Sequence, residues 1–149
     1  MAVNQDFAGR TYPPSGPWPV DADLIAAFAA AVGAEDPVHT DPEAARAAGY
    51  ADVVAPPTMA VRFSQQADHD YISDPDAGID FSRVVHGEQR FVHYRPITAG
   101  DELLGALTVD SIRAAGGHSM VTTRTELTTA SGDAVATCTS TIVVRGGGE

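Results

Sequence analysis

Lysine is absent from this chain of 149 residues, and all nine of its basic residues are arginine. Against twenty acidic residues they leave a net charge of −11. Such a chain has no basic patch with which to neutralise a phosphate backbone, so we expect no nucleic-acid partner. The length, with a hydrophobic content of 44%, instead predicts one soluble globular domain over residues 1–149 that is large enough to bury a core.

Cysteine and long apolar runs are equally scarce. Cys138 is the single cysteine, which excludes an internal disulfide and is typical of a reducing cytoplasm. We expect it to be a small core residue within a strand. No apolar run approaches the ~20 residues of a membrane span, and the N-terminus lacks the basic and apolar regions of a signal peptide. We therefore expect a cytoplasmic protein that does not associate with membranes.

Motifs that bind metals, phosphates or dinucleotides are missing as well. No two histidine or cysteine residues stand at a metal-ligand spacing, and the glycines lie in turns rather than between a strand and a helix. No G-x-S-x-G segment is present for a serine hydrolase. The sequence thus predicts no metal site and no cofactor.

The first half of the chain is predicted to be helical after an irregular segment. Residues 1–20 include the run YPPSGPWPV, whose prolines exclude a helix or a central strand. Tyr12 and Trp18 are expected to cover the edge of the core. Apolar spacing and capping residues then predict three helices, the last of them enclosed by a sheet: 21–32, 41–49 and 57–70.

The second half changes to a period of two, which is typical of strands. Its segments are rich in threonine and valine, as suits a half-buried sheet, with a possible bulge at Gly87 and a hairpin turn at Gly116 and Gly117. Helices followed by strands predict an α+β fold with the helices on one face of a four-stranded antiparallel meander. The meander leaves an edge or face that a second copy would complete. Its strands are predicted at 84–95, 102–113, 118–129 and 134–145.

The stretch VGAEDPVHTD, residues 32–41, is the first candidate site. A glycine and a proline fix the direction of a short loop in which His39 is surrounded by Glu35, Asp36 and Asp41. A carboxylate beside a histidine raises the pKa of the imidazole and fixes its tautomer, as a general base requires. A structural role is the alternative, in which His39 bonds to Asp36 or Asp41 at the start of the following helix.

The second candidate site is VVHGEQRF, residues 84–91, because its polar density is unusual for a strand that packs on one side. A solvated face with cross-strand charge pairs explains the pattern equally well. We place His93 on the outer face, and His69 and His118 at the surface. Strict alternation separates the strand into two faces, unless a bulge at Gly87 shifts the register: His86, Glu88 and Arg90 on one, Gly87, Gln89 and Phe91 on the other.

Two longer stretches resemble a known family. VGAEDPVHTDPEAARAAGYADVVAPPT and DFSRVVHGEQRFVHYRPITAGDEL are similar to MaoC-like hot-dog proteins, and most closely to the single-hot-dog group related to the subunits of (3R)-hydroxyacyl-ACP dehydratases. The resemblance covers nearly the whole chain. It implies a long helix wrapped by an antiparallel sheet and paired with a second hot dog, as a homodimer or a heterodimer. Acyl thioesters, of coenzyme A or of acyl carrier protein, would bind at the junction between the two.

The resemblance also implies an acid/base pair. Active members read roughly G-D-x-N-P-hydrophobe-H-x-D, and the Asp and His activate water for reversible addition to a 2-enoyl thioester. His39 matches the base, but Ala34 stands at the position of the catalytic aspartate and Asp36 at that of the asparagine. The resemblance therefore predicts His39 as base, with Asp36 or Glu35 substituting for the missing acid.

In such proteins a backbone N–H at the start of the long helix polarises the thioester carbonyl. Pro56 and Pro57 lack an N–H at this point, so the donor would be Thr58 or Gly87. Four further side chains are expected to contact the substrate, although core packing explains the last two as well: His86, Gln89, Met59 and Phe63.

The sequence thus predicts a hydratase or dehydratase of 2-enoyl and (3R)-hydroxyacyl thioesters with a degenerate acid/base loop. The alternatives are a non-catalytic acyl-binding subunit of a heterodimer, an enzyme that adds an amine instead of water, and a thioesterase on the same fold. The acidic chain repels both coenzyme A phosphates and an acidic carrier protein, so either partner requires a local arginine cluster. The candidates for it are Arg10, Arg46, Arg62, Arg83, Arg90 and Arg95.

Overall fold

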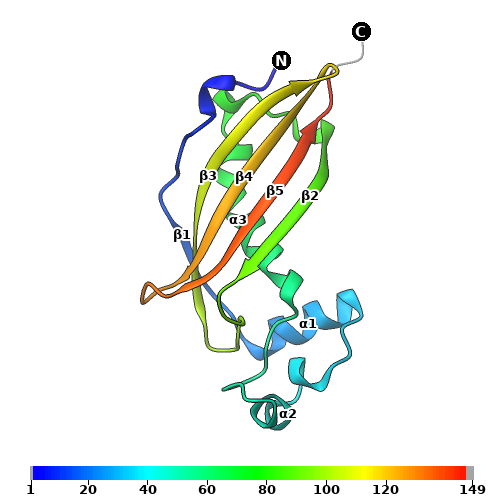
Figure 1. The fold of residues 1–149 in the computed structure, drawn as a ribbon, viewed down its shortest axis with the longest axis vertical. Coiled ribbons are helices and arrows are strands. Elements are labelled where there is room, and N and C mark those ends of the chain that lie inside the picture. Colours follow the sequence, from blue (N-terminus) through cyan, green and yellow to red (C-terminus); the bar gives the residue numbers. More distant parts are fainter. Residues whose placement is uncertain (1, 147–149) are drawn as a thin grey trace.

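The computed structural model describes residues 2–146 as a curved antiparallel sheet with one long helix along one face (Figure 1). Two shorter helices gather at one end of that sheet. No helix of the described residues is long and apolar enough to cross a membrane. The helices are α1 (Ala22–Val32), α2 (Pro42–Ala47) and α3 (Ala60–Ile72), and the strands are β1 (Ser15–Pro19), β2 (Val84–His93), β3 (Glu102–Ala115), β4 (His118–Thr129) and β5 (Ala134–Val144).

The three predicted helices are confirmed, and their ends follow from their caps. The Asp21 carboxylate accepts the Leu24 N–H at 2.7 Å to begin α1, and Gly33 ends it in the left-handed conformation, with a φ of 71°. Asp41 also caps α2, with its carboxylate accepting the Glu43 N–H. The third helix opens as a short 3₁₀ turn, η3 (Pro57–Met59), and continues as α3 two residues beyond its predicted end.

An edge strand corrects the prediction that residues 1–20 are irregular. Among residues 2–146, β1 pairs only with β3, and the strand order β1-β3-β4-β5-β2 leaves its other side without a strand partner. Proline is tolerated there because no neighbouring strand needs its missing N–H. The edge position of Trp18 is confirmed, since its ring stacks on Phe63 with centroids 6.2 Å apart. A 3₁₀ turn, η1 (Gln5–Phe7), adds further order to this segment.

The predicted four-stranded meander was wrong in one pairing of strands. β3, β4 and β5 are consecutive neighbours, but β2 pairs with β5 rather than with β3. The connection 94–101 is bonded to a distant segment, through Ala55 N–H to Ile97 O at 2.8 Å and Ala99 N–H to Val53 O at 3.0 Å. Held in this way, it carries the chain across the end of the sheet instead of folding β3 back on β2.

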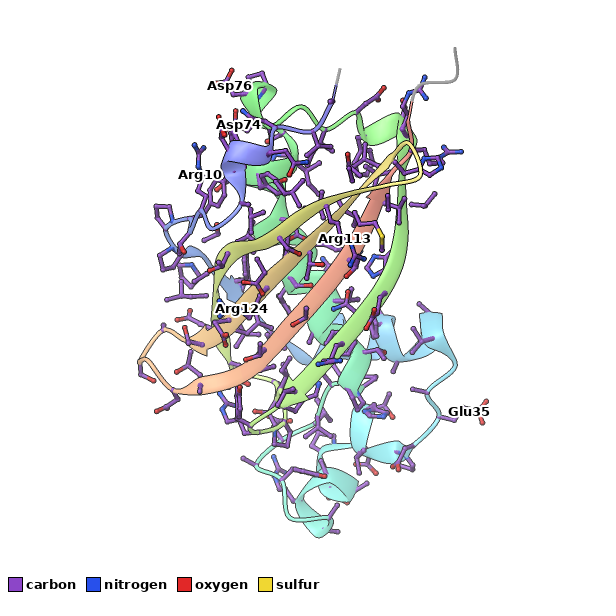
Figure 2. The ribbon with its side chains drawn as sticks, turned by 45° about the horizontal axis from the view of Figure 1, so that its top comes forward. Arg10, Glu35, Asp74, Asp76, Arg113 and Arg124 are labelled. Atoms are coloured by element: carbon purple, nitrogen blue, oxygen red, sulfur yellow. The ribbon has the colours of Figure 1, made fainter. Side chains whose placement is uncertain are left out.

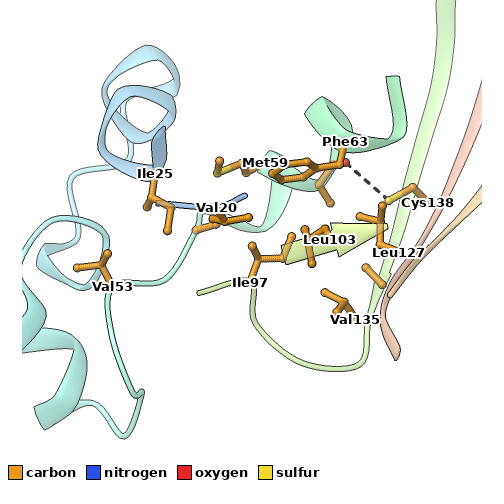
Figure 3. Close-up of a cluster of buried hydrophobic side chains, with 13 residues drawn as sticks. Val20, Ile25, Val53, Met59, Phe63, Ile97, Leu103, Leu127, Val135 and Cys138 are labelled. Atoms are coloured by element: carbon orange, nitrogen blue, oxygen red, sulfur yellow. Dashed lines mark hydrogen bonds between the residues drawn. The ribbon is translucent and has the colours of Figure 1, made fainter. Parts of the chain in front are cut away.

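The core between α3 and the sheet consists of two hydrophobic clusters. The first is drawn in Figure 3 and includes Met59, Phe63 and Leu127. Cys138 belongs to it, 1% exposed, which confirms its predicted core role. Burial raises the pKa of the Cys138 thiol to about 12. The second cluster lies toward the other end of α3, around Phe7, Tyr71, Leu107, Val109 and Val121.

Candidate functional site

His39 is the last residue of a short 3₁₀ turn, η2 (Pro37–His39), in the loop between α1 and α2. Asp36 starts this turn by accepting the Val38 N–H at 3.1 Å. The imidazole is buried, 9% exposed, and its Nδ1 lies 2.6 Å from the carbonyl oxygen of Val54. A carbonyl only accepts, so Nδ1 carries the proton and Nε2 of the neutral ring is the basic nitrogen. This tautomer is the one that a general base uses through Nε2.

The predicted carboxylate partners of His39 lie elsewhere. Asp36 and Asp41 both accept backbone N–H groups as helix caps, of Val38 and Glu43 respectively. The His39 ring is held by a backbone carbonyl, and within residues 2–146 it forms no hydrogen bond with a carboxylate. The structural alternative, in which His39 bonds to Asp36 or Asp41, is therefore wrong, because the ring bonds to the Val54 carbonyl instead.

A pocket of about 490 Å³ opens beside His39. Three segments meet there: the η2 loop, the chain before η3, and the end of β2 with the residues that follow it. Asp36 lines the same pocket as His39. The lining residues are Asp36, Val38, His39, Tyr50, Val54, Ala55, Pro56, Pro57, His93, Tyr94, Arg95, Pro96 and Ile97.

His93 is a pocket residue that the sequence analysis missed. Its Nε2 lies 2.9 Å from the Pro57 carbonyl, and its ring centroid is 6.0 Å from that of Phe91. The predicted outer face was wrong, because residues two apart in a strand share a face and Phe91 packs against the core. Alternation from the apolar Phe91 therefore predicts that His93 lies on the inner face of β2.

The predicted bulge at Gly87 is confirmed, and it corrects the two faces of β2. The pairing with β5 shifts between His86 and Glu88. His86 therefore joins the inner face, where it lines a second pocket with Ser140, and Gln89 lies on the same face with its Oε1 2.6 Å from the Ser140 hydroxyl. The strict alternation that grouped His86 with Glu88 was wrong, since one extra residue reverses the register.

The other expected site residues do not line the His39 pocket. The Glu35 side chain is exposed and projects away from the molecule (Figure 2), and it does not line the pocket. Thr58 is exposed in η3, next to the pocket residue Pro57. Met59 and Phe63 are 0% and 1% exposed in the first core cluster, which gives them a packing role.

Positive charge is sparse around the pocket. Arg95 alone of the six candidate arginines lines it, and its guanidinium binds the Asp101 carboxylate through two contacts of 3.0 Å. This ion pair raises the pKa of Arg95. Figure 2 shows Arg10 far from the η2 loop, beside Asp74. Within residues 2–146, no group of three or more His, Cys, Asp or Glu side chains is arranged to hold a metal ion.

Known proteins resemble this chain in sequence and in fold. The model of the family described as the FAS1-like dehydratase domain region matches residues 6–138. A UPF0336 protein of Saccharopolyspora erythraea is 49% identical over 100% of this chain and 96% of its own. A chain of the HadBC (3R-hydroxyacyl-ACP dehydratase) complex of Mycobacterium tuberculosis is 30% identical, with a TM-score of 0.82 over 93% of this chain and 97% of that one.

A longer MaoC-like dehydratase is also 30% identical, with a TM-score of 0.87. It matches 95% of this chain, which spans only 43% of that protein. The predicted resemblance and the predicted α+β architecture are both confirmed by these similarities. The chain belongs to the family of the FAS1-like dehydratase domain region, and its long helix and antiparallel sheet form the hot-dog fold of the MaoC-like dehydratases.

Proposed function

We propose that this chain is a subunit of a hot-dog hydratase or dehydratase that adds water reversibly to 2-enoyl thioesters of coenzyme A or acyl carrier protein. The observation that carries the proposal is the buried His39, whose Nδ1 donates to Val54 O and whose ring lines a pocket. Family membership supports the class of reaction. Similarity to a (3R)-hydroxyacyl-ACP dehydratase complex supports the class of substrate.

His39 would serve as base and then as acid. Its Nε2 removes a proton from a water molecule while the water oxygen bonds to C3 of the enoyl group. The electron pair of the double bond moves toward the thioester carbonyl, and the imidazolium returns the proton to C2. Dehydration is the reverse. The Asp36 carboxylate already accepts one N–H, so it is suited to orienting the water rather than to supplying a proton.

Negative charge on the thioester oxygen requires a donor at the start of the long helix. Because Pro56 and Pro57 have no N–H, the first one in η3 belongs to Thr58, next to a pocket wall formed by both prolines. The first N–H groups of a helix have no acceptor within it and lie at the positive end of its dipole. We therefore assign the oxyanion contact to Thr58 in preference to Gly87, which lies near the opposite end of β2.

A second hot-dog subunit is part of this proposal. β2 is an edge strand of the sheet and carries two exposed apolar side chains, Val85 and Val92, 43% and 47% exposed. An apolar edge strand without a neighbour is a template for strand pairing. Antiparallel pairing of two such strands about their midpoints would bring residue 84 of one beside residue 93 of the other. The partner would then cover the side of the pocket that β2 borders.

Hydration of crotonyl-CoA by the purified protein, followed as loss of enoyl absorbance, tests the proposal. We expect turnover that His39→Gln lowers by about 100-fold or more, since this is the usual contribution of a general base. His118→Gln is the matched control, because His118 is exposed and bonds only to Gly146 N–H at the end of the described chain. Turnover that His39→Gln leaves unchanged would refute the role of His39.

The rival function is a non-catalytic acyl-binding subunit, favoured by the alanine at position 34 where the resemblance places an aspartate. Under this alternative the isolated protein shows no hydration, and a co-expressed hot-dog partner restores activity that His39→Gln does not reduce. Release of free thiol without loss of the enoyl group would instead identify a thioesterase. Loss of the enoyl absorbance, its dependence on His39 and release of free thiol thus distinguish the three functions.

A further inference from the structure

The face of α3 that packs on the sheet is apolar at its two ends and includes buried polar residues near its middle. The two hydrophobic clusters occupy its two ends. Where the clusters meet on α3, β4 and β5, several buried residues are polar. They form a polar layer across the core, with Ala67 of the second cluster between the two that α3 contributes: Ser64, Asp68, Thr123, Thr125 and Ser140.

This layer ends in a pocket of about 650 Å³ between α3, β2 and β5, which we call the Asp68 pocket. Its deep residues are Asp68 and Ser140, 6% and 4% exposed. Phe81, 70% exposed, lies at its mouth. Between them the wall mixes the aliphatic side chains of Ile72, Val84 and Ile142 with polar ones, among them Gln65 and Ser73. The pocket thus joins a partly apolar passage to a polar deep end.

Asp68 lacks a full set of donors. Its Oδ1 is covered by protein and has no hydrogen-bond partner among the described residues. Two nearby hydroxyls are already used, since Ser140 donates to Gln89 Oε1 and Ser64 to the Val61 carbonyl. Burial raises the pKa of Asp68 to about 6, and the Thr123 hydroxyl offsets this in part. A buried acceptor without a donor is costly, so a donor brought by a ligand would be bound strongly.

We propose that the Asp68 pocket binds an acyl chain that bears a hydrogen-bond donor, a hydroxyl or an amine, with the Asp68 carboxylate as acceptor. The aliphatic side chains of the wall would cover the methylene groups that precede the donor. Asp68 lines this pocket, so its carboxylate can accept a hydrogen bond from a ligand there. His69 and His86 line the pocket near its mouth and form no ion pair with Asp68 within the described residues.

This inference rests on the proposed function and narrows its substrate. The Asp68 pocket lies at the residue-84 end of β2, and the His39 pocket at the residue-93 end. Pairing two β2 strands antiparallel would therefore set the Asp68 pocket of one protomer next to the His39 pocket of its partner. A chain attached to a thioester beside His39 would extend into the Asp68 pocket of the other protomer.

Small amphiphiles test the pocket without any reaction. Hexylamine, 1-hexanol and hexanoate are titrated into ¹⁵N-labelled protein at neutral pH, and amide shifts report both affinity and location. We expect shifts centred on Ile72, Val84 and Ile142, with hexylamine bound about tenfold more tightly than hexanoate and 1-hexanol between them. Asp68→Asn should remove the preference for hexylamine. Asp70→Asn, an exposed residue of the same helix, should leave the preference intact.

Equal affinities for the three amphiphiles, shifts outside the Asp68 pocket, or a preference that survives Asp68→Asn would each overturn the inference. Relative affinities of hexylamine and 1-hexanol distinguish an amine from a hydroxyl as the natural donor. Crotonyl-CoA hydration tests the proposed function separately. Hydration without a preference for the amine refutes only the Asp68 pocket, and amine binding without hydration refutes only the proposed function.

Discussion

Replacing Asp68 by asparagine is expected to make the protein more stable at neutral pH, an unusual result for a buried polar side chain. Asp68 has a pKa of about 6 in the folded protein, chiefly through burial, against an ordinary value of 3.8. Its ionised form is therefore disfavoured by folding. Asparagine keeps the shape of the side chain and cannot ionise, so it removes this penalty.

The direction with pH follows from the raised pKa. Below pH 3.8 the carboxyl is neutral in both the folded and the unfolded chain, and burial has no ionisation penalty. As pH rises through about 6, the unfolded chain has already ionised and the folded chain resists, so stability is lost. A difference of one in pKa corresponds to about 1.4 kcal/mol, so the full loss is up to about 3 kcal/mol at pH 7 or above.

Urea unfolding at fixed protein concentration, at pH 4.5 and at pH 7.5, measures this effect. We expect Asp68→Asn to raise the free energy of unfolding by about 2–3 kcal/mol at pH 7.5 and by much less at pH 4.5. Asp70→Asn, exposed on the same helix, should change stability by under about 0.5 kcal/mol at both values. An equal gain at both pH values, or a loss at pH 7.5, would refute the assignment of the penalty to a buried charge.

Three further predictions concern the core, a glycine contact and the edge strand. Cys138, 1% exposed and with a pKa of about 12, should resist a disulfide reagent at pH 8 until urea unfolds the chain. Gly105→Ala should destabilise the fold by about 1–3 kcal/mol in urea titration, because its Cβ would lie 3.0 Å from two atoms of the Trp18 ring. Val92→Glu should shift the protein toward monomer in sedimentation experiments, whereas Val32→Glu, 51% exposed on α1, should not.

Local sequence signals predicted the elements well because those signals act locally. Asp21 and Gly33 bound α1 through contacts within a few residues of each end, and the glycine at position 87 marked its own bulge. The pairing of β2 with β5 escaped prediction because it depends on bonds between residues 53–55 and 97–99. The residue types of these two segments do not indicate which distant backbone each segment will bond to.

The candidate site shows the same division. The position of His39 was predicted from its loop, but its hydrogen-bond partner is the carbonyl of Val54, fifteen residues away. A backbone acceptor leaves no trace in the side chain of the residue that provides it, so the neighbouring acids seemed the natural partners. His93 was misplaced although alternation from Phe91, two residues earlier on the same side of the bulge, puts it on the inner face.

Unsatisfied polar groups do not all point to ligands, and the buried tyrosines make the distinction. The hydroxyls of Tyr12 and Tyr71 also lack hydrogen-bond partners in the described part of the chain. Burial raises the pKa of Tyr71 to about 12, so its hydroxyl stays neutral, and its ring packs 5.9 Å from Phe7. Aromatic packing of this kind offsets one missing bond. Asp68 has no comparable apolar surface and is largely ionised at neutral pH, so a donor from outside the chain is the missing part of its environment.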